Sequence, residues 1–236
     1  MNAKSAKGNT MTENLPLQKG SFFYLFVALI VLLLLYPFFE GQAYGRPIMA
    51  LLISVILLAA IYAVSDSLRD IIIAVLLGIP FMLFNWLAQL EIIQESIWLS
   101  GITYAIPFYL FTTFHILYVI AKSKKVTANI LYGAVCVYLL FGLVWASIYF
   151  MVEQISPGSF QFAEFADING KAGWGDFMYY SYVTLTNLGY GDITPVTARA
   201  KSFVILEAIT GVLYIAVMIS RIVGLYITRR QKDFVE

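Results

Sequence analysis

The sequence predicts an all-α membrane protein with six transmembrane helices and a shorter apolar segment that enters the membrane between the fifth and the sixth. Three observations predict this fold class. Hydrophobic residues make up 61% of the 236 residues and charged residues only 12%, whereas globular chains are about 45–50% apolar and about 25% charged. Six apolar runs have about the length, ~20 residues, that a helix needs to cross a ~30 Å hydrocarbon core. The breaks between these runs carry turn residues and charges.

The apolar runs divide the chain into two units. They cover residues 22–39, 47–64, 71–90, 101–121, 126–152 and about 200–228. We therefore expect a tail over 1–21, a four-helix unit over 22–121, a second unit over 122–228 and a short tail over 229–236. Six crossings place both termini on the same side of the membrane.

The basic residues indicate which side that is. If the amino terminus lies inside, ten Lys and Arg residues fall in cytoplasmic segments and four fall outside. The cytoplasmic set is Lys4, Lys7, Lys19, Arg69, Lys122, Lys124, Lys125, Arg229, Arg230 and Lys232, and the outer set is Arg46, Lys171, Arg199 and Lys201. Because cytoplasmic loops carry the excess of positive charge, we expect a multi-pass protein of the plasma membrane with both termini in the cytoplasm.

The composition also argues against several function classes. A single cysteine, Cys136, excludes a disulfide framework and a multi-cysteine metal site. One histidine, His115, leaves no histidine-based metal centre, and no nucleophile–base pair is evident, so we do not expect an enzyme or a cofactor. A net charge of +1 gives no reason to expect nucleic acid as a partner. Membrane lipid is the expected surrounding.

The segment over 175–186 is apolar but too short to span. At 1.5 Å per residue it reaches about 18 Å. The glycine-containing stretch from Asn187 to Asp192 follows it and does not favour a helix. Non-helical backbone at membrane depth is tolerated only where it is buried in protein or lines a wet cavity. We therefore expect a half-helix, with Asp176 at its positive end, followed by an extended return strand.

Two glycines flank a tyrosine in this return strand. Glycine adopts positive φ without a Cβ penalty, so Gly189 and Gly191 allow successive carbonyl groups to point in one direction. Leu188 and Tyr190 are expected to point their side chains back into the protein. Stacked carbonyl oxygens of this kind replace the water shell of a monovalent cation. A simple surface turn is the alternative, but the position between two spans argues against it.

Residues 184–192, Thr-Leu-Thr-Asn-Leu-Gly-Tyr-Gly-Asp, resemble the potassium-channel signature TxTTVGYGD. The stretch 207–226 is similar to the inner helix of small bacterial potassium channels, and the resemblance covers roughly 126–226. The first four runs agree with six-helix members in number and position. The resemblance implies a selectivity filter and supporting residues. The filter residues would be Asn187, Leu188, Gly189, Tyr190 and Gly191, and the supporting residues Tyr179, Tyr180, Thr184, Thr186, Asp192 and Glu207.

The resemblance has two departures and one consequence for assembly. Asn187 stands where the family has a threonine, and Leu188 where it has a valine. The threonine hydroxyl helps to form the innermost ion site, so Asn187 bears on the choice between potassium and sodium. One chain supplies one filter loop, and a filter ring needs four, so we expect a homotetramer that holds potassium ions and no other metal.

Charged residues within the spans give further expectations. The run 101–121 has no Arg or Lys, and each charge moved yields only about 2.3 kcal/mol per 100 mV, so we expect little intrinsic voltage sensing. His115 is expected to be a packing residue. Glu207 is a candidate brace behind the filter, Arg221 is expected to snorkel, and Gly211 is either a gating hinge or a close-packing site.

The leading interpretation is a potassium-selective channel that conducts passively through a homotetrameric pore. Two alternatives stay open: a weakly selective potassium/sodium channel, because of Asn187, and a non-conducting membrane scaffold.

Overall fold

The computed structural model describes residues 21–39, 44–88, 95–163 and 173–233. Its elements follow in the order α1 (Phe22–Phe39), α2 (Gly45–Ala63), α3 (Leu68–Leu87), α4 (Glu95–Lys122), α5 (Ala128–Ile155), β1 (Phe160–Phe162), α6 (Trp174–Leu185), β2 (Ile193–Pro195) and α7 (Ala198–Asp233). The helical fold class is confirmed. The predicted tails, 1–21 and 229–236, lie largely outside the described residues, except that α7 continues five residues beyond the predicted end at 228.

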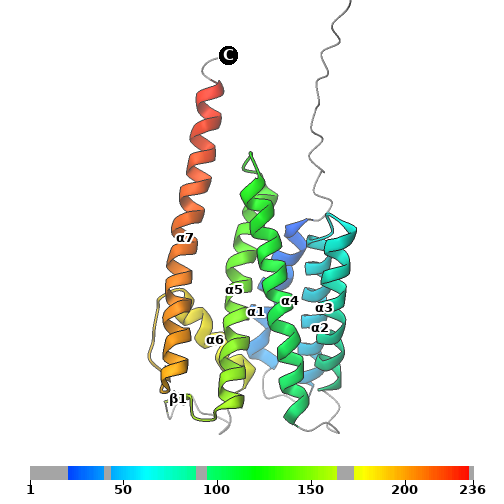
Figure 1. Cartoon of the computed structure of the whole chain (residues 1–236), viewed down its shortest axis with the longest axis vertical. Coiled ribbons are helices and arrows are strands. Elements are labelled where there is room, and N and C mark those ends of the chain that lie inside the picture. The colour runs from blue at the N-terminus through cyan, green and yellow to red at the C-terminus, as the bar shows by residue number, and fades with distance from the viewer. Residues whose placement is uncertain (1–20, 40–43, 89–94, 164–172, 234–236) are drawn as a thin grey trace, which may run out of the picture.

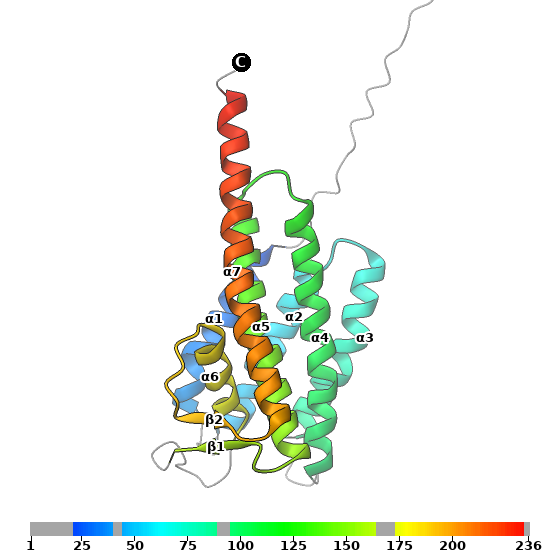
Figure 2. The ribbon, with the colours of Figure 1, turned by 60° about the vertical axis from the view of Figure 1, so that its left-hand side comes forward.

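The long helices run up and down beside one another (Figure 1). The start of α1 and the end of α7 lie at the same end of the bundle, which we call the termini end. The short helix α6 and both strands lie at the other end, which we call the α6 end. Figures 1 and 2 show α7 standing beside α5 and α6, apart from α2 and α3. The predicted division into a four-helix unit, α1–α4, and a second unit that contains α5–α7 stays a prediction, because α5 packs on α4 and α1 as well as on α6.

Within the described residues, five helices are long and apolar enough to cross a membrane. These stretches are Phe22–Phe39, Leu68–Leu87, Gly101–Lys122, Ala128–Ile155 and Ala198–Gly224. The predicted second run corresponds to α2, whose apolar part, Pro47–Ala63, is shorter. These helices support a membrane protein, while a sixth crossing stays a prediction.

The breaks between helices are formed by local capping. Ser67 precedes α3 with extended backbone, and its side chain accepts a hydrogen bond from the Asp70 N–H. Thr127 caps α5 in the same way through the Ile130 N–H. Short polar side chains at this position satisfy the free N–H groups of the first turn. The turns at Ser65–Ser67 and Ser123–Thr127 therefore follow from the sequence.

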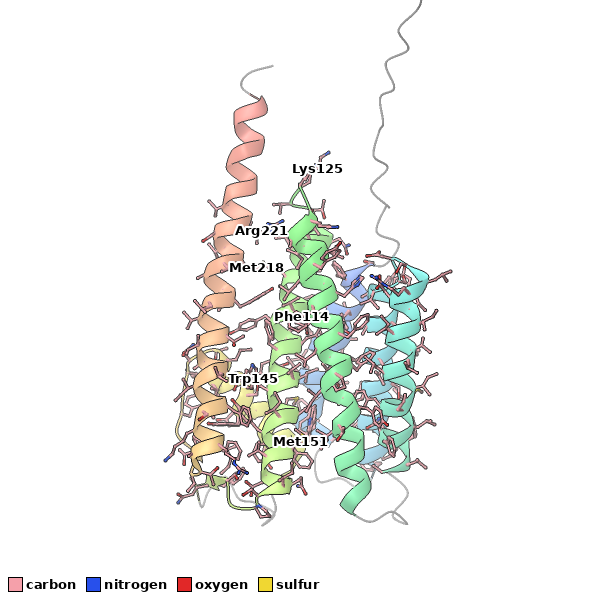
Figure 3. All side chains as sticks on the ribbon, viewed as in Figure 1. Phe114, Lys125, Trp145, Met151, Met218 and Arg221 are labelled. Carbon is pink, nitrogen blue, oxygen red and sulfur yellow. The ribbon has the colours of Figure 1, made fainter. Side chains whose placement is uncertain are left out.

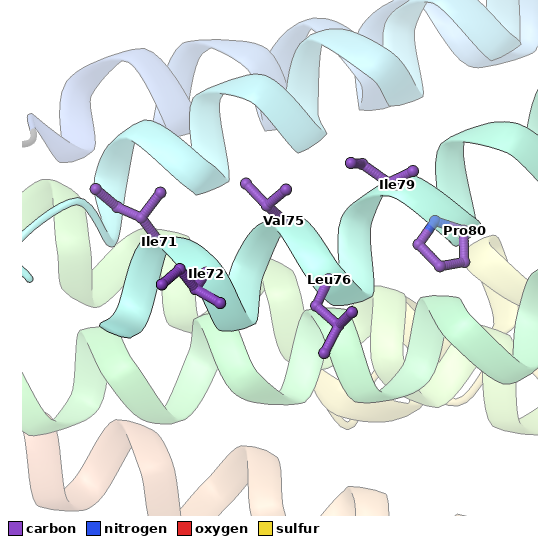
Figure 4. Close-up of a pocket in the computed structure, with 6 residues that line it drawn as sticks. All are labelled: Ile71, Ile72, Val75, Leu76, Ile79 and Pro80. Carbon is purple, nitrogen blue, oxygen red and sulfur yellow. The ribbon is translucent and has the colours of Figure 1, made fainter. Parts of the chain in front are cut away.

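A core of buried apolar side chains joins α5 to the four helices α1–α4. Phe22, Leu25, Leu29 and Leu32 of α1 are almost fully buried in it. The outward face of α3 differs, because Ile71, Ile72, Val75, Leu76, Ile79 and Pro80 line a shallow apolar hollow on the surface (Figure 4). An apolar outer face of this kind suits contact with lipid.

The sequence did not predict the two short strands. β1 and β2 form an antiparallel pair in which Phe160 faces Pro195 and Phe162 faces Ile193. This pair ties the end of α5 to the start of α7 at the α6 end. At three residues each, the strands are too short for the alternating pattern by which a strand is recognised.

Candidate functional site

The predicted half-helix over 175–186 is present as α6, Trp174–Leu185. Asp176 lies in its first turn, and its carboxylate accepts a hydrogen bond from the Gly173 N–H at 2.7 Å. α6 rises from the α6 end toward the middle of the bundle, and the chain then returns to the same end (Figure 2). The carboxyl end of α6, with its partial negative charge, is therefore directed toward the middle.

Side chains of α6 fasten it to α5. The Ser181 hydroxyl donates to the Gly142 carbonyl oxygen at 2.8 Å, and the Tyr182 hydroxyl donates to the Leu139 carbonyl oxygen at 2.7 Å. A Cβ atom at Gly142 would collide with the Tyr182 ring. The absence of a side chain at Gly142 thus permits the close approach of α5 and α6.

The chain reverses immediately after α6. The Leu188 and Gly189 N–H groups both donate to the Val183 carbonyl oxygen, at 2.9 and 3.3 Å, and the Asn187 N–H donates to the Thr184 carbonyl oxygen at 2.9 Å. The Thr186 hydroxyl donates to the Tyr182 carbonyl oxygen at 2.7 Å. These bonds fix the start of the return strand against the last turn of α6.

Positive φ angles occur at every second residue of the return strand. Asn187 has φ 57°, Gly189 has φ 58° and Gly191 has φ 80°. A Cβ atom at either glycine would meet no atom within 4 Å, so backbone conformation rather than space calls for glycine there. Asn187 is an addition to the sequence prediction. The signal was available, because Asn is among the non-glycine residues most tolerant of positive φ.

The side chains between these positions are not packed against the chain itself. Leu188 is 56% exposed and Tyr190 is 66% exposed. The expectation that they point back into the protein is therefore not met within one chain. Either neighbouring copies or other surroundings must cover them.

The two tyrosines of α6 lie in different surroundings. The Tyr179 hydroxyl donates to an Asp192 carboxylate oxygen at 2.6 Å, so the return strand is tied back to α6. Tyr180 is instead buried, with its ring against those of Tyr149 and Phe160.

Glu207 of α7 is fully buried between three helices. It is hydrogen-bonded to the Ser181 hydroxyl of α6 at 2.5 Å and to the Tyr149 hydroxyl of α5. These contacts place Glu207 behind α6, where it holds the helix that carries the return strand. Its contacts are with α6 and α5, and not with residues 187–191 in the hydrogen bonds observed.

Gly211 lies within α7, which continues as a helix through it. A Cβ atom there would collide with the Leu185 carbonyl oxygen at the end of α6. The close-packing interpretation of Gly211 therefore has a defined contact, and the hinge interpretation stays a prediction.

The fourth predicted run contains no basic residue before Lys122, at the end of α4. His115 lies in α4, and its Nε2 atom is 3.3 Å from an Asp66 carboxylate oxygen, while Nδ1 is 3.9 Å from Asp70. The sequence prediction of a packing residue did not find these acidic partners, because they lie 49 and 45 positions earlier in the chain. Within the described residues, no group of His, Cys, Asp and Glu side chains could hold a metal ion.

Comparison with known proteins bears on the second unit. A family model described as "ion channel" matches residues 133–227, which include most of α5, all of α6, the return strand and most of α7. No curated protein matches the chain. The family match supports an ion channel.

Proposed function

We propose that the chain is a potassium-selective channel that conducts passively through a homotetrameric pore, with residues 187–191 as its selectivity filter. The alternation of positive φ at Asn187, Gly189 and Gly191 carries the proposal. When left- and right-handed residues alternate, successive carbonyl groups are brought to the same side of the strand, as a ring of ion-binding oxygens requires. The strand lies within the region that matches the ion-channel family model.

The exposed side chains of the return strand support a tetramer. Leu188 and Tyr190 are more than half exposed in one chain, and four strands around one axis would cover them with neighbouring α6 and α7 helices. Lipid-exposed backbone that is not hydrogen-bonded costs several kcal/mol per group. The proposed site is therefore incomplete without the other three copies.

The proposed topology follows the sequence prediction. Six helices cross the plasma membrane, α6 and the return strand re-enter it from outside, and both termini lie in the cytoplasm. Residues 22–121 form a voltage-sensor-like unit without gating charges, and residues 122–228 form the pore unit. Tyr179, Tyr180, Thr184, Thr186, Asp192 and Glu207 support the filter, and potassium is the only ion that it holds.

Flux from liposomes that contain purified protein tests the proposal. With opposed potassium and sodium gradients, we expect a potassium flux that disappears on Gly191→Ala substitution. When sodium is the only cation, we expect a much slower sodium flux. Wild-type protein that carries no ion flux, or flux that ignores Gly191 and Tyr190 substitutions, would overturn the pore assignment and favour the scaffold alternative.

One observation favours a second candidate, a weakly selective potassium/sodium channel. Asn187 places a side-chain amide, with both an oxygen and two donor hydrogens, where the family signature has a hydroxyl. Reversal potentials in bilayers with unequal potassium and sodium separate the two candidates. A reversal potential near that of potassium supports selectivity, and one between the two ions supports the second candidate.

A further inference from the structure

The middle of α7 exposes much of its apolar surface in the single chain. Val212, Leu213 and Val217 are more than half exposed there. Contacts come instead from one stripe of the helix at spacings of four and three residues, which lie on one face. The Tyr214 hydroxyl donates to the Ala134 carbonyl oxygen of α5 at 2.6 Å, and Met218 is buried in the core that contains α5.

Arg221 completes this stripe, but it reaches a different helix. Its guanidinium donates to the Ile120 carbonyl oxygen from Nε at 3.2 Å and from Nη2 at 2.8 Å. Nη2 also lies 2.5 Å from the Ala121 carbonyl oxygen and 3.1 Å from that of Ser123. Figure 3 shows Met218 and Arg221 directed from α7 toward α5 and the end of α4. The expectation that Arg221 snorkels to the membrane surface stays a prediction, and the sequence did not predict that the guanidinium binds the end of α4.

The acceptors of Arg221 lie at the carboxyl end of α4, with Ile120 and Ala121 in its last turn and Ser123 directly after it. The last carbonyls of a helix have no partner within it and carry the negative end of the helix dipole. A guanidinium presents several donors in a fixed fork, so one side chain reaches all three carbonyl oxygens, of which that of Ile120 also accepts the Ser123 N–H at 3.2 Å. A neutral or single-donor side chain at position 221 cannot reproduce this contact.

We propose that Arg221 is a tether through which the four-helix unit holds the termini end of α7, and so sets the width of the inner mouth of the pore. The link to the pore rests on the proposed channel function. The tether joins residues about one hundred positions apart, and it pulls α7 toward its own α4 and α5. In the proposed tetramer the other three copies would lie on the exposed side of α7, so this pull would keep the four α7 ends apart.

Release of the tether should let the four α7 ends converge and should lower flux. We expect Arg221→Ala to reduce potassium flux by about fivefold or more, because fivefold is the lower end of the typical coupling between two sites of one protein. Arg221→Lys keeps the charge without the fork and should lie between Arg221→Ala and the wild type. Ser220→Ala is the matched control, because the Ser220 hydroxyl bonds only within α7, to the Ala216 carbonyl oxygen in the contacts observed.

A distance measurement tests the tether independently of conduction. Spin labels are attached to Lys125→Cys, in the α4–α5 turn, and Val223→Cys, on α7, in a Cys136→Ala background. Labelled chains are diluted with unlabelled ones so that one assembly carries one label pair. Arg221→Ala should lengthen and broaden the distance distribution, whereas Ser220→Ala should leave it unchanged.

The two measurements separate the possible failures. An unchanged distance distribution in Arg221→Ala overturns the tether, whatever the flux. A changed distance with wild-type flux means that Arg221 ties α7 to α4 without setting the width of the inner mouth, and it leaves the channel proposal intact. If the wild-type protein carries no flux, the channel proposal fails, and the link to a pore fails with it, while the distances still decide whether Arg221 ties α7 to α4.

Discussion

Helices α5 and α7 are both long and apolar, yet the chain buries them very differently. Within an apolar 18-residue segment of each helix, 61% of the α5 residues are buried, against 17% of the α7 residues. α5 contacts α1, α4, α6 and α7, whereas α7 leaves Leu206, Val212, Leu213 and Val217 more than half exposed. A helix that is apolar all round needs apolar surroundings on every side. α7 therefore needs apolar surroundings that one chain does not supply, which are lipid or, in the proposed tetramer, neighbouring copies.

This difference separates two kinds of substitution. A change on the α5 side of α6 and α7 acts inside one chain and should show in folding. A change on the open side, which includes the return strand, should show in assembly and flux while the chain still folds. The following predictions test that separation, and they run from the largest expected effect to the smallest.

Gly189→Ala should abolish potassium flux and leave the helix content of the chain unchanged. Gly189 has φ 58°, and a non-glycine residue pays about 1–2 kcal/mol in this conformation, in every copy. A Cβ atom would meet nothing within 4 Å in the single chain, so folding is not obstructed. Liposome flux and circular dichroism provide the two measurements.

Gly158→Ala is the matched control for Gly189→Ala. Gly158 has φ 83° and likewise no atom near a Cβ, but it lies in the loop after α5. It should keep most of the flux. Equal loss of flux in both variants would mean that backbone strain anywhere at the α6 end is enough to stop conduction. The assignment of residues 187–191 as the filter would then lose its support.

Glu207→Ala should lower the thermal stability of the purified protein. It leaves the buried Tyr149 hydroxyl without its partner, and a buried polar group left unsatisfied costs about 1–3 kcal/mol, whereas the Ser181 hydroxyl keeps the Gly142 carbonyl oxygen. Glu207→Gln keeps an oxygen and a similar shape, so it should unfold near the wild-type temperature. If the two variants melt together, Glu207 does not act through these hydrogen bonds.

Gly211→Ala should destabilise the protein by about 1–3 kcal/mol, the usual cost of inserting a methyl group into a packed contact. The added Cβ collides with the Leu185 carbonyl oxygen and forces α6 and α7 apart. Gly224→Ala, in the same helix with open space around it, is the control for helix propensity. Denaturant unfolding measures the difference. Altered flux at wild-type stability would instead favour the hinge interpretation.

Tyr179→Phe should have the smallest effect, about 1 kcal/mol per copy, because it removes one half-exposed hydrogen bond to Asp192. We expect a modest fall in flux and in the thermal stability of the assembly. In a double-mutant cycle, Tyr179→Phe and Asp192→Asn should be strongly non-additive. Additive effects would show that the two side chains do not act as a pair.

Much of the fold could be predicted from local pattern. The positions of the long helices follow from apolar runs, and Ser67 and Thr127 mark where α3 and α5 begin. The length and position of α6 were predicted within one residue at each end. Positive φ was predicted at Gly189 and Gly191 but not at Asn187, because the preference of Asn for this conformation is real but weaker than that of glycine.

Long-range contacts were the part that the pattern could not supply. The roles of Arg221, His115 and Gly211 depend on atoms of Ile120, Asp66 and Leu185, which are remote in sequence or belong to the backbone. A backbone carbonyl is present at every residue, so the sequence does not mark the one that a distant side chain will reach. The β1–β2 pair was missed for a similar reason, because the residues that pair lie far apart in the sequence.

The sequence by itself determined that this chain is an apolar helical protein with one segment too short to span, since hydrophobic content, run length and glycine spacing are local properties. Only the tertiary structure decided that Glu207 holds α6 against α5 and that Arg221 fastens α7 to the end of α4. Those contacts arise when helices far apart in the chain are packed side by side, and their geometry depends on the whole bundle.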